Sequence, residues 1–142
     1  MTGDAARQTE MAHTSMPFTA ELELTVTSVD ASAVVGRAEW TPERCTAGGV
    51  LHGGYLMAVA DSIGALCAFF NLPQGSSTGT IESKTNFFRA VRGGEIEVIA
   101  TPVHVGRSTI VIQTDIVDGD GRLVTRTMQT QAVLGRSAQH AE

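Results

Sequence analysis

A single carboxylate interrupts a long apolar segment, and this segment constrains the fold more than any other part of the chain. Between Tyr55 and Phe70, the only polar side chains are those of Asp61 and its neighbour Ser62. A helix that is apolar on every face is buried, so we expect a buried helix over residues 53–71. Because an ionised carboxylate is costly to bury without partners, the acid at position 61 indicates a functional site.

The rest of the chain has the alternating pattern of strands. It predicts strands over residues 21–29 and 33–41 before the helix, and over 78–91, 95–105, 109–117 and 123–134 after it. Short connections that contain glycine, such as Arg92-Gly93-Gly94, favour antiparallel hairpins. We therefore predict an α+β fold in which one long central helix is wrapped by one curved antiparallel sheet, with a second copy of the chain as possible further cover.

The length of 142 residues suits one domain with one core. Residues 1–15 are small and polar, and we expect them to form a flexible N-terminal tail. Residues 16–136 then form the single domain, beginning with a short helical turn near Pro17, and residues 137–142 form a flexible C-terminal tail.

Composition excludes several classes of function. The net charge of −5 argues against a nucleic-acid-binding protein. The apolar helix is shorter than the roughly 20 residues that cross a bilayer, and no signal peptide is visible, so we expect no membrane partner. Cys45 and Cys67 fit a reducing cytoplasm and have no metal-ligand spacing with His13, His104 or His140, so we expect neither metal nor cofactor.

The predicted helix begins at His52, Gly53 and Gly54 rather than at a residue that usually caps a helix. The glycines leave the first backbone amides uncovered, and free amides at the positive end of a helix dipole bind negative charge. Such amides suit the oxyanion that forms when water attacks an ester or thioester carbonyl. The alternative is that the glycines only allow the loop to pack tightly on the helix.

Asp61 follows Gly53 by eight residues, which places it about 12 Å further along the helix axis. An acid cannot reach a carbonyl held at the start of its own helix. It can reach the equivalent site of a second subunit if two helices lie side by side and antiparallel, so the spacing suggests an active site shared in a dimer. The alternative is a structural aspartate satisfied by backbone groups or by Ser62.

Three segments carry a resemblance to a known family. Gly49-Val50-Leu51-His52-Gly53-Gly54 followed by Ala60-Asp61-Ser62 resembles the signature of hotdog-fold acyl-CoA thioesterases. The branch resembled is the phenylacetate-degradation (PaaI-like) type, related to the 4-hydroxybenzoyl-CoA thioesterases. The resemblance continues through residues 80–94 and 117–124 and covers roughly residues 17–134. It implies the hotdog fold.

The resemblance also implies residue roles. Asp61 falls at the position of the catalytic carboxylate, which acts as general base or nucleophile, and the Gly53 amide where the family polarises the thioester carbonyl. His52 falls at the helix-start histidine, and Thr80 where related enzymes carry a Ser or Thr from the partner subunit. Thr46 departs from the family, which often has Asn there to hold the water.

Other residues are candidates for binding the substrate. Gly54 and Ser62 belong to the same signature. Seven of the ten basic residues lie from Lys84 onward, and the candidates among them for the phosphates of coenzyme A are Arg89, Arg92 and Arg107. Ordinary surface charge is the alternative for each arginine. We expect most of the phenylalanines to pack in the core, and the alternative is that their rings line an acyl or aryl pocket: Phe69, Phe70, Phe87 and Phe88.

The sequence therefore predicts an acyl-CoA thioesterase that releases a carboxylic acid and free coenzyme A and acts as a homodimer or as a tetramer of two dimers. One alternative is a non-catalytic acyl-thioester-binding protein, which the Thr46 departure keeps open. The other is a hotdog hydratase or dehydratase of enoyl- or hydroxyacyl thioesters, which is expected to pair a catalytic histidine with the acid. Fold alone does not decide among these functions.

Overall fold

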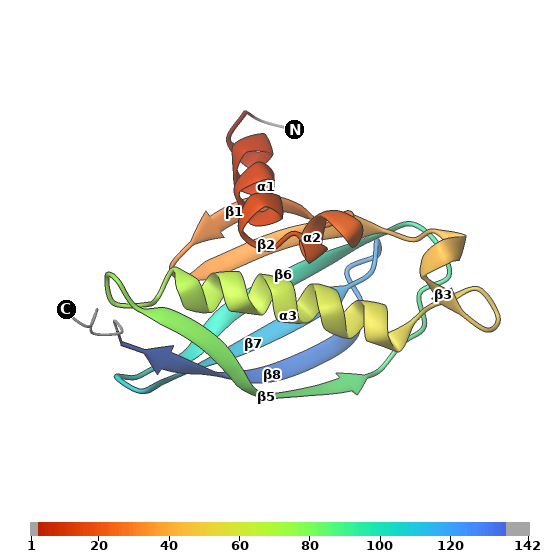
Figure 1. Ribbon diagram of the computed structural model, residues 1–142. Helices are drawn as coiled ribbons and strands as arrows, with labels where there is room; N and C mark the ends of the chain where they lie inside the picture. The colour runs from red at the N-terminus through yellow and green to blue at the C-terminus, as the bar shows by residue number, and fades with distance from the viewer. Residues whose placement is uncertain (1–2, 136–142) are drawn as a thin grey trace.

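One long helix lies across a six-stranded antiparallel sheet in the computed structural model of the chain, which describes residues 3–135 (Figure 1). The helices are α1 (Gly3–Ser15), α2 (Phe18–Glu21) and α3 (Gly53–Phe69). The strands of the large sheet are β1 (Thr25–Asp30), β2 (Ala33–Glu39), β5 (Ser77–Phe87), β6 (Glu95–Val105), β7 (Thr109–Val117) and β8 (Leu123–Leu134). Before α3, a 3-10 turn (Pro42–Arg44) leads into a small hairpin of β3 (Cys45–Thr46) and β4 (Val50–Leu51).

The sheet has the strand order β1-β2-β6-β7-β8-β5, and every neighbouring pair is antiparallel. The predicted α+β class with one long central helix is therefore confirmed, and the strands over 95–105, 109–117 and 123–134 have the predicted bounds. Pro102 lies where the β6–β7 register shifts, as its missing N–H favours. The sheet brings β5, which follows α3 directly, to one edge beside β8.

The core lies between α3 and the inner face of the sheet. Val59, Ile63 and Cys67 of the helix are fully buried there. They pack against the alternating inward side chains of the central strands, which are Ile96, Val98, Ala100, Ile110, Ile112 and Ile116. Because Ile63 approaches Gly36 of β2 so closely that a Cβ there would lie 2.6 Å from its Cδ1 atom, the helix sits almost directly on the backbone of the sheet.

One face of α3 is not covered by the sheet, which corrects the expectation that the helix is buried all round. Met57, Asp61, Ala65 and Phe69 are spaced four residues apart, and we call this stripe the open face. Met57 is 39% exposed, Phe69 is 55% exposed, and Asp61 is exposed. Apolar content alone did not reveal the open face, because three of its four side chains, Met57, Ala65 and Phe69, are as apolar as those of the core.

Strand β5 runs beside the open face and forms one edge of the sheet. It is 11 residues long, and its register with β8 shifts between Thr80 and Glu82, which makes Ile81 an extra residue that is 63% exposed. A long edge strand presents unpaired backbone groups that favour pairing with another chain. The open face of α3 therefore lies beside a strand edge that can pair with another chain.

The expectation of a flexible tail over residues 1–15 is wrong for residues 3–15, which form α1. Ala5, Thr9 and Ala12 make a narrow stripe of small side chains, and the two alanines are buried. The hydroxyl of Thr9 donates to the Val26 carbonyl and accepts from the Val26 N–H, which fixes α1 against β1. A stripe of alanine and threonine is a weak signal in a sequence, so the polar composition hid it.

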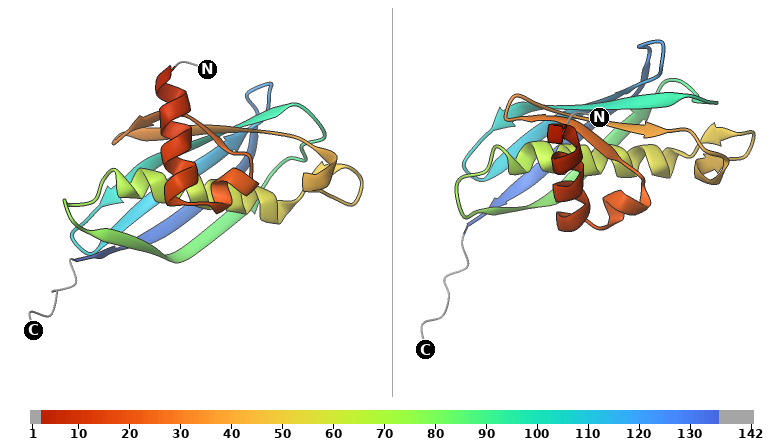
Figure 2. Two further views of the ribbon diagram at one scale, coloured as in Figure 1. Left: turned by 45° about the horizontal axis from the view of Figure 1, so that its top comes forward. Right: turned by 90° about the horizontal axis from the view of Figure 1, so that it is seen from above.

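Figure 2 shows that α1 stands across the β1 end of the sheet, at a steep angle to α3. The predicted domain therefore extends to Gly3 at its N-terminal side. The predicted C-terminal tail over residues 137–142, and residue 136, lie outside the described part of the chain. Within residues 3–135, no helix has the length and apolar character needed to cross a membrane.

The docking of α1 predicts the effect of one substitution. Thr9→Val keeps the shape of the side chain but leaves the Val26 backbone groups without their hydroxyl partner, so we expect a loss of about 1–2 kcal/mol in the free energy of unfolding. Chemical denaturation measures this loss. Thr14→Val, at an exposed position of the same helix, is the control and should change stability by less. Equal stability of the two variants would contradict the docking.

Candidate functional site

The start of α3 is built by the side chain of His52 and by two glycines. His52 is the N-cap residue in an extended conformation, and its Nδ1 accepts the Gly54 N–H at 2.8 Å. A Cβ at Gly54 would lie 3.0 Å from that Nδ1, so the glycine allows the cap to form. The expectation of uncovered amides is therefore wrong for Gly54, whose N–H is not free to bind substrate.

The Gly53 amide differs from its neighbour. Its N–H has no hydrogen-bond partner among residues 3–135. A Cβ at Gly53 would lie 3.3 Å from the ring of Phe87, so β5 lies closely over this first helical residue. The first amide of α3 is therefore a free donor at the positive end of the helix dipole.

A hollow of about 310 Å³ opens at this point, lined by Val50, Leu51, Gly53, Leu56, Phe87, Phe88, Arg89 and Ala90. Phe87 and Phe88 are half exposed beside it. The hollow joins the free amide of Gly53 to apolar rings and to one positive charge, that of Arg89. This combination suits a carbonyl group carried on an anionic ligand.

The Asp61 carboxylate lies over the β5 and β8 side of the sheet and has two donors. The Thr80 hydroxyl of β5 donates to Asp61 Oδ1 at 3.4 Å, and the Gln129 Nε2 of β8 donates to the same oxygen. Gln131 Nε2 donates to the Thr80 hydroxyl at 2.9 Å, and Thr78 donates to Gln131 Oε1 at 3.1 Å. The acid is therefore held by a polar network from two neighbouring strands.

The surroundings of Asp61 change its acidity. Removal of water by the packed helix and strands raises the pKa of Asp61 above its ordinary value, and the Thr80 hydrogen bond opposes this in part. The Asp61 side chain is partly exposed in the single chain, but the atoms packed around its carboxyl group are enough to raise its pKa. A raised pKa makes the carboxylate a stronger base.

A second hollow of about 350 Å³ begins one helical turn beyond Asp61. Apolar side chains of α1 and α3 dominate its lining, which comprises Met11, Ser15, Met16, Ala65, Leu66, Phe69 and Thr78. Phe69 lines this hollow, and Phe87 and Phe88 line the hollow at the helix start. All three rings are half exposed, so the expectation that most of the phenylalanines pack in the core is wrong for them. Phe70 makes an edge-to-face contact with Phe69, their ring centroids 5.5 Å apart.

Other predicted site residues have structural partners. The Ser62 hydroxyl donates to the Ala58 carbonyl at 2.8 Å within α3, so its partner is its own helix. Thr46 is exposed on the small hairpin that leads into α3, and no hydrogen bond joins it to Asp61 in the described chain. A water held by Thr46 would therefore lie at the helix start, away from the acid of the same chain.

The three candidate arginines do not form one cluster in a single chain. Arg89 donates to the Leu123 carbonyl at 2.9 Å and lines the hollow at the helix start. Arg92 donates to the Gly48 carbonyl at 2.8 Å, which fixes the loop before α3. Arg107 is exposed in the β6–β7 turn, where Val133 N–H bonds Ser108 at the far end of the sheet. Of the three arginines, Arg89 is thus the one that lines the same hollow as the free Gly53 amide.

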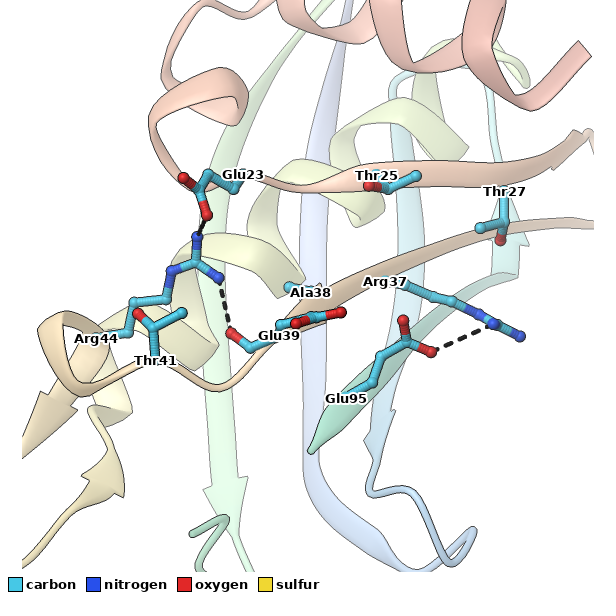
Figure 3. Close-up of a pocket in the computed structure, with 9 residues that line it drawn as sticks. All are labelled: Glu23, Thr25, Thr27, Arg37, Ala38, Glu39, Thr41, Arg44 and Glu95. Atoms are coloured by element: carbon cyan, nitrogen blue, oxygen red, sulfur yellow. Dashed lines mark hydrogen bonds and ion pairs between the residues drawn. The ribbon is translucent and has the colours of Figure 1, made fainter. Parts of the chain in front are cut away.

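A further hollow, on the outer side of β1 and β2, offers less chemistry (Figure 3). Its two arginines are already paired: Arg44 with Glu23, and Arg37 with Glu95 at 3.2 Å. Arg44 also lies 5.2 Å from the centre of the Tyr55 ring. Both arginines of this hollow are therefore engaged in ion pairs with neighbouring acids. Within residues 3–135, no group of three or more histidine, cysteine, aspartate or glutamate side chains is placed to hold a metal ion.

Sequence reasoning missed Gln129 and Gln131. The signal was present in β8, where Thr125, Thr127, Gln129 and Gln131 alternate with outward residues, and all four are buried. Such a polar row on the inward face of a strand is unusual because buried polar groups need partners. The alternation by itself indicates only a strand.

Comparison with known proteins points to one family. The thioesterase superfamily matches residues 48–125, which include α3, β5, β6, β7 and the start of β8. A putative esterase of Mycobacterium tuberculosis is 30% identical over 115 residues, which are 79% of this chain and 82% of that protein. The solved structure of that esterase has a TM-score of 0.82 and 28% identity over 86% of this chain and 99% of its own.

Two other relatives match a shorter part of the chain. A putative esterase of Haemophilus influenzae is 35% identical over 86 residues, and a 1,4-dihydroxy-2-naphthoyl-CoA hydrolase of Escherichia coli is 31% identical over 86 residues. These matches cover 61% of this chain and 62% and 63% of the relatives, so the chain spans less than two thirds of their length. A crystal structure of thioesterase HI1161 of Haemophilus influenzae shares the fold, with a TM-score of 0.87 and 24% identity over 99% of this chain and 97% of its own.

The His52 cap predicts a graded effect on stability. Replacing His52 by Ala removes the acceptor of the Gly54 N–H, and we expect the free energy of unfolding to fall by about 1 kcal/mol. His52→Asn restores a short side-chain acceptor and should recover most of this loss. Thermal or chemical denaturation of the two variants measures the difference. An alanine variant as stable as the parent would show that the cap contributes nothing.

Proposed function

Because the chain belongs to the thioesterase superfamily, we propose that it hydrolyses the thioester of an acyl-CoA to a carboxylic acid and free coenzyme A. One observation carries the proposal. The Asp61 carboxylate, with its raised pKa, and the free Gly53 amide lie on one helix; Gly53 lines one hollow, and a second hollow begins one helical turn beyond Asp61. A base and an oxyanion donor are the two groups that such a hydrolysis requires.

We propose further that each active site takes its two groups from two copies of the chain. The axial separation of about 12 Å prevents one helix from offering both groups to one carbonyl. The open face of α3 and the edge of β5 form a surface that a second copy can cover, pairing strand edges and laying the two helices side by side. The active unit is then a homodimer, and a tetramer of two dimers stays a prediction.

The reaction follows from these groups. The Gly53 N–H of one copy polarises the thioester carbonyl and stabilises the oxyanion that forms on it. The Asp61 carboxylate of the other copy removes a proton from water as the oxygen attacks, or attacks the carbonyl itself in a covalent route. In the general-base route the carbon–sulfur bond breaks, the thiolate of coenzyme A leaves with a proton, and the oxygen of water enters the acid. In the covalent route an Asp61 oxygen displaces the thiolate to give a mixed anhydride, which water then hydrolyses to the acid and free Asp61. A single turnover in water labelled with ¹⁸O identifies the covalent route with water attacking the Asp61 carboxyl carbon, because the label then stays on Asp61, whereas the general-base route places the label only on the acid.

The two hollows suit the two ends of this substrate. The apolar hollow beyond Asp61 suits an uncharged acyl or aryl group, with Phe69 as one wall. The hollow at the helix start suits the thiol side, where Arg89 is placed to meet the negative charge of coenzyme A. This division supports the acyl-CoA class of substrate, and the PaaI-like type within the superfamily stays a prediction from the sequence. The two free cysteines support a reducing compartment such as the cytoplasm.

The alternative functions differ in their use of the site. A hydratase is expected to need a histidine at the reacting carbons, but His52 is engaged as the helix cap. A binding protein without turnover is favoured by one observation. Position 46 is a threonine, whereas the resembled family often has an asparagine there to hold the water. A screen of short, long and aromatic acyl-CoA thioesters, read both as binding and as release of free thiol, separates binding from hydrolysis.

The proposed role of Asp61 as a base predicts how much a substitution there lowers kcat and how kcat/KM depends on pH. Asp61→Asn should lower kcat at least about a hundredfold, because an amide cannot accept the proton. In the parent, kcat/KM should fall as the pH drops through the raised pKa of Asp61, since only the ionised form is a base, and should level off above it. Steady-state thioester hydrolysis measures both.

The matched control is Asp120→Asn, which changes an exposed acid in the β7–β8 turn and should leave the rate unchanged. An Asp61→Asn variant that folds and turns over at the parent rate would refute the role of Asp61.

A further inference from the structure

The buried amide of Gln129 approaches the Asp61 carboxylate from beneath the helix. Gln129 lies on β8 and is fully buried, whereas Asp61 lies on α3 at the open face. Its Nε2 donates to Asp61 Oδ1 and also lies 3.3 Å from the Thr80 hydroxyl. A carboxylate only accepts hydrogen bonds, so the nitrogen end of the amide must face it.

The other end of the same amide is left without a partner. Gln129 Oε1 is buried and has no hydrogen bond in the described chain. A glutamine that served only the core would be expected to satisfy both ends, because an unpaired buried oxygen is costly. Here the donor end is satisfied at Asp61 and the acceptor end is not, so the side chain is oriented toward the acid at a cost to stability.

A glycine in α3 makes this approach possible. Gly64 lies three residues after Asp61 on the helix, and Gln129 Oε1 occupies the place where a Cβ of residue 64 would be. The Thr114 hydroxyl lies 3.1 Å from the same place. Any larger residue at position 64 would displace the amide. A glycine in the middle of a helix weakens it, so this glycine has a packing reason.

We propose that Gln129 is a positioning residue for the acid: it orients the Asp61 carboxylate toward the open face and favours its ionised form. The proposal rests on the proposed function only where activity is the readout. Because an N–H donor stabilises the ionised carboxylate more than the neutral acid, its loss makes protonation easier. Gln131 supports the arrangement from one step away, since it bonds the Thr80 hydroxyl and not the acid.

Within residues 3–135, no charged neighbour is placed to stabilise the ionised form of Asp61 in the way that Gln129 does. The charged residues of β5 are Glu82 and Lys84, both exposed, and Lys84 donates to Asn86 at 2.9 Å. On β8, Arg126 pairs with Asp115 of β7 on the outer face of the sheet at 2.7 Å. The inward residues of β2, β6 and β7 under the helix are uncharged. Thr80 and Gln129 are therefore the polar groups that face the Asp61 carboxylate.

The test measures the ionisation of Asp61 in two variants that remove the contact differently. Gln129→Leu deletes the donor, and Gly64→Ala adds one methyl group to α3 and displaces the amide. In each variant, the midpoint of the acid limb of the kcat/KM profile should lie about one pH unit higher than in the parent. Thr127→Val is the control, because this buried residue of the same inward row bonds Thr85 and not Asp61.

The pKa of Asp61 is also measured directly, by ¹³C NMR titration of the labelled carboxyl group. This measurement needs no turnover, so it separates a failure of this proposal from a failure of the proposed function. An Asp61 pKa that rises in both variants and stays unchanged in Thr127→Val supports the positioning role. An Asp61 pKa in Gln129→Leu and Gly64→Ala equal to that of the parent would overturn it, whatever their stability.

Discussion

The structure depends most on the fixed distance that helix α3 keeps between two of its own groups. Helix α3 fixes the Gly53 amide and the Asp61 carboxylate about 12 Å apart along its axis, and no movement of side chains closes that distance. The fold then has to bring an acid and an amide together by other means. In the homodimer that we propose, a second copy of the chain laid antiparallel against the open face brings them together at both ends of the pair of helices, because such an interface repeats every contact under its twofold axis.

The sheet holds that helix in place. The fully buried Val59 and Ile63 seat α3 on the central strands, and Gly36 lets Ile63 reach the backbone of β2. With one side of the helix committed to the core, Asp61 is left on the opposite side, above β5 and β8. Its polar support therefore comes from these two strands. The edge position of β5 has a second consequence, since the strand that carries Thr80 is also the strand that a second chain can extend.

The succession of strands and helix along the chain was predictable, because the strands alternate in the sequence and the helix is one long apolar run. The strands of the second half alternate over 9 to 12 residues, and the glycine turns mark where each one ends. Helix α1 was not predictable in the same way, because its buried stripe consists of alanine and threonine. The family resemblance and the carboxylate at position 61 were visible in the residues themselves.

The geometry around the site was less accessible to sequence reasoning. That His52 caps Gly54 depends on the conformation of one side chain, and a histidine before two glycines also fits a loop with free amides. The link from Gln129 to Asp61 joins residues 68 positions apart and depends on the register of β8 under α3. The open face is the clearest case. A sequence states that a helix is apolar, but not whether its own sheet or another molecule covers each side.

One measurement tests the shared site most directly, and it uses two inactive variants. Asp61→Asn lacks the base, and Gly53→Pro lacks the amide N–H while keeping a residue that helices accept at their first position. Gly53→Ala is its control, since it adds a Cβ near Phe87 but keeps the N–H. Refolding the two inactive chains together should restore about a quarter of the parent activity, because half of the dimers are mixed and each of these has one intact site. A mixture as inactive as its components would contradict the account, since an acid and an amide of the same chain would then have to act together.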